Sequence, residues 1–576
     1  MQNMGRNSYS QKVWRVNSRT KDVSYETVPE TWEHLGGRGL VARILLDEVS
    51  PTCEPLGPLN KLIFAPGLLV GHMLSSCDRI SVGGKSPLTG GVKEANAGGT
   101  TGLKLSHLGI KALILEDKPN NAEWSVLFIN HEGARFDSCQ NLVGHGVFEC
   151  GKSLVEKYGD KIAVAVIGQG GELQLSSAGV QNFDKENLPS RIAARGGLGA
   201  VMGSKRIKAI VIDANHGQKP PIAKPVEYKN AQKAYTQALM SHPQTAVYRD
   251  YGTAAMSRMC HTFGALPTRN FSSGQFENVD TITGEYMRDV ILEREGEGET
   301  THACMPGCTI RCSNNYADAD GRSIVSPLEY ETIGLLGSNL GIGDLDKIAK
   351  LNWIVNDMGL DSIEIGAALG VAAKAGLMDF GDYNRALELL DEIKRNTPLG
   401  RLLGSGATTV GKVLGIEQVP AVKGQAMSAY EPRAIKGTGV TYATSPQGAD
   451  HTSGLTIRAK INHLDPIGQA AVSRTAQINM AGYDTLGACI FAGFGFSVAP
   501  ETIKDLLNAR YGWETSSDIL QVLGKETLKL EREFNRRAGF TNEDDRLPEW
   551  MTREVLPPHN ATFDVPNSDL DGLFNW

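Results

Sequence analysis

This sequence lacks three features that would assign it to a broad class of proteins. No stretch approaches the ~20 apolar residues that a membrane-spanning helix needs, so we expect no insertion into a bilayer. Acidic and basic residues nearly balance, with a formal net charge of −7 over 576 residues, so charge does not favour binding to nucleic acid or to a membrane surface. The opening residues, MQNMGRNSYSQKVWRVNSRTKD, contain no apolar segment, and we expect no signal peptide.

Cysteine is also scarce, at nine residues, and nine is an odd number. Secreted proteins that rely on disulfide bonds are richer in cysteine and usually carry an even number. A reducing cytoplasm therefore fits the composition best. In that compartment a cysteine cluster more often marks a metal site or a catalytic site than a set of disulfides.

The N-terminal third contains short segments rich in valine, isoleucine and leucine, punctuated by glycine, which predict β-strands. These segments are Lys111–Asp117, Ser125–Asn130, Lys161–Gly168 and Lys205–Asp213. The following residues, Asn215–Pro225 (NHGQKPPIAKP), break the pattern and are typical of a linker.

Beyond this linker, apolar residues recur at helical spacing. Residues 227–242 predict one helix, and Gly343–Gly376 predicts at least two helices joined by a turn at Gly359. Residues 516–539 predict an amphipathic helix, and residues 557–576 an irregular tail.

These patterns together predict an α+β fold. We expect a β-rich N-terminal domain over residues 1–214. Two mostly α-helical domains should follow, over residues 215–425 and 426–576. No internal repeat and no low-complexity segment interrupts this order.

Three of the nine cysteines, Cys304, Cys308 and Cys312, lie close together in the run HACMPGCTIRCSN. Pro306 and Gly307 disfavour a continuous helix, so we expect a loop. Soft thiolates from one loop suit zinc or an iron–sulfur cluster. Zinc would need a second ligand pair that the sequence lacks, whereas a cubane cluster accepts a fourth ligand from far away. Radical S-adenosylmethionine enzymes have the spacing C-x₃-C-x₂-C, whereas three residues separate Cys308 from Cys312 here. Cysteines that only pack in a core would not explain the proline, glycine and arginine around these thiols.

A distant fourth cysteine ends a short glycine motif. The hexapeptides Asn356–Asp361 (NDMGLD) and Asp484–Cys489 (DTLGAC) share one pattern, with a polar residue three positions before a glycine. Glycine turns of this kind bring backbone N–H groups and one polar side chain up to a flat ligand. The pair of motifs therefore predicts Cys489 as the fourth ligand.

With these motifs in this order, the chain resembles the aldehyde:ferredoxin oxidoreductase family over nearly its whole length. Family members hold tungsten, sometimes molybdenum, between two pyranopterin dithiolenes beside one 4Fe–4S cluster. Further segments that carry the resemblance are Leu35–Val49, Gly84–Gly99, Arg195–Ile210, Gly264–Phe271 and Pro327–Ile333. The family usually has two residues in the first cysteine gap where this chain has three, which indicates a subgroup that keeps the cluster.

The resemblance implies that the domain over residues 1–214 binds the tungsten pterin cofactor. It also implies which residues hold these groups. The cluster ligands would be Cys304, Cys308, Cys312 and Cys489. One pterin phosphate and a bridging Mg²⁺ would be contacted by Asn96, Gly98 and Gly99. The other phosphate would meet the backbone of Ala194, Arg195 and Gly196. The remaining contacts to the cofactors would come from Arg79, Asn356, Leu360, Asp361, Asp484, Gly487, Ala488 and Cys489.

Two residues match positions that the family places near the metal. Glu331, in PLEYETI, would accept a proton, and His451, in SPQGADHT, would donate a hydrogen bond to the aldehyde oxygen. Glu329 is the second candidate for the base, expected to lie on the other side of Tyr330.

The implied activity is oxidation of an aldehyde to a carboxylic acid with oxygen from water. The other five cysteines are too scattered for a second cluster, so a ferredoxin or a dedicated iron–sulfur subunit should accept the electrons. We expect a hetero-oligomeric complex. Two rivals stay open: the catalytic subunit of a low-potential tungsten reductase that acts on aromatic acyl thioesters, and an electron carrier without catalysis. Retention of Glu331 and His451 favours aldehyde oxidation.

Overall fold

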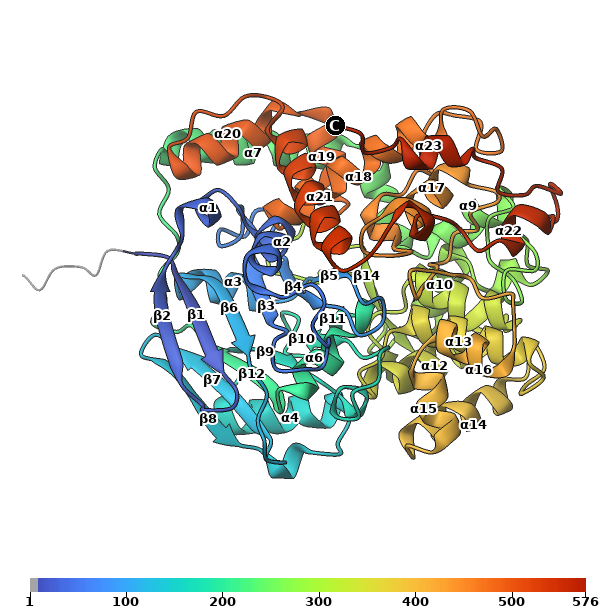
Figure 1. The fold of residues 1–576 in the computed structure, drawn as a ribbon, viewed down its shortest axis with the longest axis horizontal. Coiled ribbons are helices and arrows are strands. Elements are labelled where there is room, and N and C mark those ends of the chain that lie inside the picture. The colour runs from blue at the N-terminus through green and yellow to red at the C-terminus, as the bar shows by residue number, and fades with distance from the viewer. Residues whose placement is uncertain (1–8) are drawn as a thin grey trace, which may run out of the picture.

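The computed structural model describes residues 9–576 of the chain. Residues 1–8 lie outside this part, and with them the beginning of the segment in which we expect no signal peptide. Figure 1 shows the N-terminal sheets in blue to green, with the helices of the later segments beside and above them. The prediction of an α+β fold, β-rich first and mostly helical afterwards, is confirmed.

The first sheet has six strands in the order β2-β1-β6-β3-β4-β5. Its strands are β1 (Lys12–Asn17), β2 (Val23–Thr27), β3 (Leu62–Pro66), β4 (Ile80–Lys85), β5 (Val92–Ala97) and β6 (Ile110–Glu116). β1 and β6 run parallel, with Val13 opposite Ala112, and the other neighbours pair antiparallel.

The second sheet also has six strands, in the order β11-β10-β9-β12-β7-β8. Its strands are β7 (Ser125–Asn130), β8 (Gly133–Ser138), β9 (Ile162–Val166), β10 (Val180–Asn182), β11 (Arg191–Ala193) and β12 (Ile207–Asp213). The four strands that the sequence predicts are confirmed as β6, β7, β9 and β12.

The two sheets share one hydrophobic core, which follows from the alternation of side chains along a strand. In β3, Leu62 and Phe64 pack into the core that the second sheet shares, whereas Ile63 and Ala65 pack into the core on the opposite face. Helix α2 (Gly37–Glu48) covers that opposite face over β3 and β4. β3 is buried along its whole length, which explains its continuous apolar sequence.

The helical part lies above and beside these sheets (Figure 1). Its main helices are α7 (Pro225–Ser241), α8 (Pro243–Tyr251), α9 (Ala255–Thr262), α10 (Gly284–Arg294), α12 (Leu345–Asp357), α13 (Ser362–Lys374), α14 (Tyr383–Lys394), α15 (Pro398–Gly404), α16 (Ala407–Leu414), α17 (Lys436–Thr444), α18 (Gln469–Leu486), α19 (Ala492–Val498), α20 (Glu501–Tyr511) and α21 (Ile519–Arg537). A small sheet contains β13 (Glu299–His302), β14 (Ser313–Ala317) and β15 (Ser323–Val325). The prediction of an irregular tail over residues 557–576 is wrong for one short segment, which forms helix α23 (Asn567–Asp571).

Contacts cross the expected domain boundaries. α7 follows the linker directly, yet it packs against α19 and α20 near the end of the chain, as Figure 1 shows at the top. α2 likewise packs against α18 and α21. The three-domain division stays a prediction. Across residues 9–576, every helix is too short or too polar to cross a membrane.

Candidate active site

The two hexapeptides form the same turn at the ends of two helices, α12 and α18. Gly359 has φ of 76° and Gly487 has φ of 77°, a left-handed conformation that favours glycine. The N–H of the following residue, Leu360 or Ala488, donates to the carbonyl five positions earlier, at 3.0 and 2.9 Å respectively. This geometry closes each helix and turns the chain sharply, so the first and last residues of each motif face the same region.

The cysteine run forms the loop between β13 and β14, as predicted. Its second cysteine, Cys308, has its Sγ 3.5 Å from the Oγ of Ser76, and the N–H of Cys489 donates to the Ser76 carbonyl at 2.7 Å. On the other side, a methyl group added to Gly98 would lie 3.1 Å from the Sγ of Cys304. The two cysteine segments therefore converge on the loop before β4 and the end of β5.

Most of the predicted site residues line one cavity of about 520 Å³. They are Arg79, Asn96, Gly98, Ala194, Arg195, Cys304, Cys312, Glu331, Asn356, Asp361, His451, Asp484 and Cys489. The other predicted residues are not part of this lining, and they are Gly99, Gly196, Leu360, Gly487, Ala488 and Cys308. Gly99 and Gly196, with φ of 99° and 82°, shape the backbone next to the wall.

A buried charge network supports the second hexapeptide, and two of its members, Arg38 and Glu531, were not among the predicted site residues. Asp484 accepts hydrogen bonds from Asn96 Nδ2 at 2.8 Å and from Arg38 Nη1 at 3.2 Å. Arg38 also forms a two-bond pair with Glu531, at 2.8 Å for each bond. Burial raises the pKa of Asp484, against the opposing effect of Arg38. Arg79 donates to Asn96 and so joins the same network.

A second network supports the first hexapeptide. Arg195 Nε donates to Asp361 at 3.3 Å, and its Nη1 donates to the Ala449 carbonyl at 2.7 Å. Lys93, fully buried, donates to Asp450 at 2.6 Å. Burial alone would raise the pKa of Asp450, but Lys93 and Arg195 outweigh it and hold that pKa well below its usual range. Lys93 and Asp450 are distant in sequence, so the sequence offered no way to pair them.

Glu331 and His451 meet in the cavity wall. The Nε2 of His451 lies 3.2 Å from Glu331 Oε1, and their side chains are 15% and 17% exposed. Tyr430 donates to the same carboxylate at 3.3 Å, and Ser428 Oγ lies 2.7 Å from His451 Nδ1.

Glu329, which flanks Tyr330 on the other side from Glu331 in the sequence, lines the same cavity as Glu331. Glu329 is hydrogen-bonded by Thr253, and burial raises its pKa. The Tyr330 side chain itself is fully buried, and its hydroxyl donates to the Ala429 carbonyl at 2.5 Å.

Aromatic rings form another part of the wall. Tyr248, from α8, lies 4.3 Å from Phe491 between ring centroids, and Phe491 lies 5.6 Å from Phe494. Arg458 lies 4.9 Å from the Tyr248 ring. These residues also line the cavity. Because they come from separate segments, spacing in the sequence could not predict them.

The donor set fits an iron–sulfur cluster. Four thiols that form no disulfide converge from two segments. Burial raises the pKa of the Cys304 thiol to about 12, and burial also raises that of Cys489 despite Arg79. Free thiolates are therefore disfavoured here, and coordination by a metal, which replaces the thiol protons, would relieve this cost. The amide, guanidinium and carboxylate groups around the cavity suit the polar edges of pterins.

Family models match nearly the whole chain. Residues 13–214 match the aldehyde ferredoxin oxidoreductase N-terminal domain, and residues 230–573 match domains 2 and 3 of the same enzyme. The chain belongs to the aldehyde ferredoxin oxidoreductase family. It is an oxidoreductase, and this family implies a tungsten pterin cofactor.

Individual relatives support the same family assignment. This chain is 33% identical to the tungsten-containing aldehyde ferredoxin oxidoreductase of Pyrococcus horikoshii over 95% of this chain and 92% of that protein. The enzyme of the same name from Thermococcus kodakarensis is 31% identical over 94% and 91%. The WOR-like subunit of a Pyrococcus furiosus aliphatic sulfonate oxidoreductase is 27% identical over 93% and 87%.

A solved structure has the same fold. It is the active site complex BamBC of benzoyl coenzyme A reductase with 1,5-dienoyl-CoA, which superimposes with a TM-score of 0.80 over 98% of this chain and 94% of that one. At 20% identity this likeness establishes the fold alone.

Proposed function

We propose that this protein oxidises aldehydes to carboxylic acids, with water as the source of oxygen. The observation that carries the proposal is the Glu331–His451 pair, at 3.2 Å, in the wall of a cavity that the cysteines and both hexapeptides also line. Membership of the family supports the same reaction class.

The chain's own residues would hold the cofactors around this cavity. Cys304, Cys308, Cys312 and Cys489 would bind a 4Fe–4S cluster. The glycine turns at Asn96–Gly99 and Ala194–Gly196 would hold the pterin phosphates and a bridging Mg²⁺, while Asn356 and Asp484 would bind the two pterin rings. When bound, a tungsten or molybdenum bis-pyranopterin supplies the two-electron redox chemistry.

Glu331 would act as the general base. Conversion of an aldehyde and water to a carboxylic acid releases two electrons and two protons. The Glu331 carboxylate accepts one of these protons, from water or from the hydrated aldehyde, as a general base. Tyr430, whose hydroxyl is 3.3 Å from Oε1, orients the carboxylate.

The contacts of His451 set its tautomer. Arg195 Nη1 donates to Ser428 Oγ at 3.2 Å, and an arginine can only donate. The Ser428 hydroxyl proton is therefore free to point at His451 Nδ1, 2.7 Å away. This leaves the His451 proton on Nε2, where it can donate to Glu331 or to an aldehyde oxygen. Arg195 thus acts as a positioning residue for His451.

The wall of Tyr248, Phe491 and Phe494 favours aldehydes with an aromatic or bulky apolar group, because flat rings stack on such surfaces. We therefore propose benzaldehyde-like compounds ahead of acetaldehyde as substrates.

Electrons would leave through a partner protein. A single cluster holds one electron at a time, so a ferredoxin or a dedicated iron–sulfur subunit would collect them in the cytoplasm. A relative named as a WOR-like subunit, and a fold neighbour solved as a complex, support a hetero-oligomeric assembly.

The alternative function is that of a catalytic subunit in a low-potential tungsten reductase for aromatic acyl thioesters. The benzoyl coenzyme A reductase fold supports it. It differs because the substrate gains electrons and receives no oxygen from water.

One comparison separates the two proposals. The purified holoenzyme is assayed with a redox dye for oxidation of benzaldehyde, acetaldehyde and a cyclic dienoyl thioester, alongside analysis of tungsten, molybdenum and iron. We expect aldehyde oxidation, with the lower KM for benzaldehyde. Turnover of the thioester with neither aldehyde oxidised would establish the alternative.

A further inference from the structure

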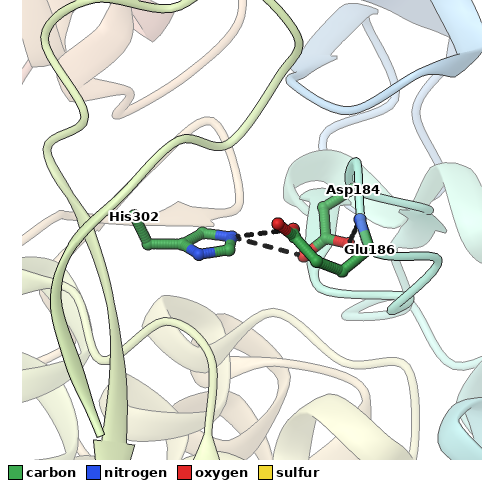
Figure 2. A group of neighbouring side chains, drawn as sticks. All are labelled: Asp184, Glu186 and His302. Atoms are coloured by element: carbon green, nitrogen blue, oxygen red, sulfur yellow. Dashed lines mark hydrogen bonds and ion pairs between the residues drawn. The ribbon is translucent and has the colours of Figure 1, made fainter.

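A second cluster of ligating side chains lies outside the cavity (Figure 2). Asp184 and Glu186 belong to the loop between β10 and β11, and His302 is the last residue of β13. His302 therefore stands immediately before the cysteine loop. The two carboxylates and the imidazole reach one another from separate segments, and Figure 2 shows the imidazole aimed at both acids.

The spacing of their ligand atoms suits one metal ion. His302 Nε2 lies 3.2 Å from Glu186 Oε2 and 3.7 Å from Asp184 Oδ2. Ligands bound at ~2.0–2.2 Å around one ion are separated by about 3–3.6 Å, for octahedral to tetrahedral angles. The His302 side chain is only 6% exposed, and its Nε2 has no hydrogen-bond partner within residues 9–576. A buried ring nitrogen without a partner, facing two carboxylates, needs a further partner.

The surrounding contacts orient each ligand. His302 Nδ1 lies 2.8 Å from Glu299 Oε2, so it carries the ring proton and leaves the lone pair on Nε2. A carboxylate behind a histidine is the usual support of a metal-bound imidazole. Lys185 binds Glu186 through Oε1, which leaves Oε2 facing His302.

Asp184 is also held in place before any ion binds. Its Oδ1 accepts the N–H groups of Glu186 and Leu188, at 2.9 and 3.0 Å, and its Oδ2 accepts the hydroxyl of Ser190 at 2.7 Å. Arg191 is a competing cation, with Nη2 3.8 Å from the same Oδ2.

We propose that Asp184, Glu186 and His302 bind one divalent transition-metal ion of the zinc type, with water in the remaining positions. One nitrogen and two carboxylate oxygens suit such borderline ions better than Ca²⁺ or Mg²⁺, which prefer oxygen ligands alone. The ion would tie the start of the cysteine loop to the second sheet. At the other end of that loop, Arg191 Nη1 already donates to Ser313 Oγ at 2.7 Å.

The test uses the purified holoenzyme, treated with EDTA and then titrated with ZnCl₂ by calorimetry. Glu186→Gln removes one ligand charge at a side chain that is 40% exposed, so it should not impair folding. His145→Gln is the matched control, because His145 pairs with Glu149 at 2.8 Å on the surface. We expect one zinc site per chain in the parent and in the control, and binding weakened tenfold or more in Glu186→Gln.

Two further readouts identify the site. Zinc-edge X-ray absorption should show nitrogen and oxygen neighbours without sulfur, which excludes zinc bound at the cysteines. Zinc should also raise the thermal midpoint of the parent and not that of His302→Gln. Equal zinc binding by parent and Glu186→Gln, or sulfur around the zinc, would overturn the proposal. His302 would then be a protonated bridge between the carboxylates.

Discussion

Replacement of Glu331 by glutamine removes a proton acceptor while it preserves the shape of the side chain. The amide can still receive the Tyr430 hydrogen bond and can face His451 Nε2, 3.2 Å from the present carboxylate oxygen. A positioned base typically contributes ~10²–10⁴-fold to a rate, or about 3–5 kcal/mol of barrier. The pair is 15–17% exposed, so water can partly replace the carboxylate. We therefore expect the lower half of that range, a loss of ~10²–10³ in kcat.

The assay is dye-linked benzaldehyde oxidation, with tungsten and iron measured on the same samples. Glu329→Gln is the control, since Glu329 lines the same cavity but bonds Thr253. Parent turnover by Glu331→Gln with full metal content would refute the reasoning. A fall in Glu329→Gln instead would move the base there.

Contact between Glu331 and His451 adds a second check. Residues in direct contact that act in one step lose rate non-additively when both are changed. We expect Glu331→Gln combined with His451→Gln to lose little more than the worse single variant. Additive losses would show that the two residues act independently.

Three further outcomes follow from the structure. Cys489→Ala should lose iron and turnover together, and full iron content with normal activity would remove Cys489 from the ligand set. Arg38→Met should lower the free energy of unfolding by ~3–5 kcal/mol, because Glu531 is left as a buried unpaired charge. Arg43→Met on the same helix, which breaks a partly exposed pair, should cost ~1 kcal/mol or less, and equal losses in denaturant unfolding would contradict this. Burial raises the pKa of Asp78 to about 6, so its stabilising protonated form is lost as pH rises from ~4 through 6. The thermal midpoint of the parent should therefore fall relative to Asp78→Asn over that window, and a constant difference would count against it.

The local sequence pattern determined much of this fold. Short apolar segments such as Ser125–Asn130 became strands, because β-branched side chains suit a buried sheet. The turn at Gly359 was predictable because only a left-handed residue closes a helix in this way. The broken spacing around Pro306 likewise predicted a loop.

The sequence by itself also determined the family, because its motifs follow the family order over nearly the whole chain. Tertiary structure alone decided which charges pair. Arg38 meets Glu531 across almost the whole chain, and Lys93 meets Asp450 in the same way. Such pairs depend on how sheets and helices pack, and no local rule carries that information. The Asp184–Glu186–His302 cluster could not be predicted for the same reason. Its members form no recognisable motif in the sequence, and they become a candidate metal site only where two separate segments meet.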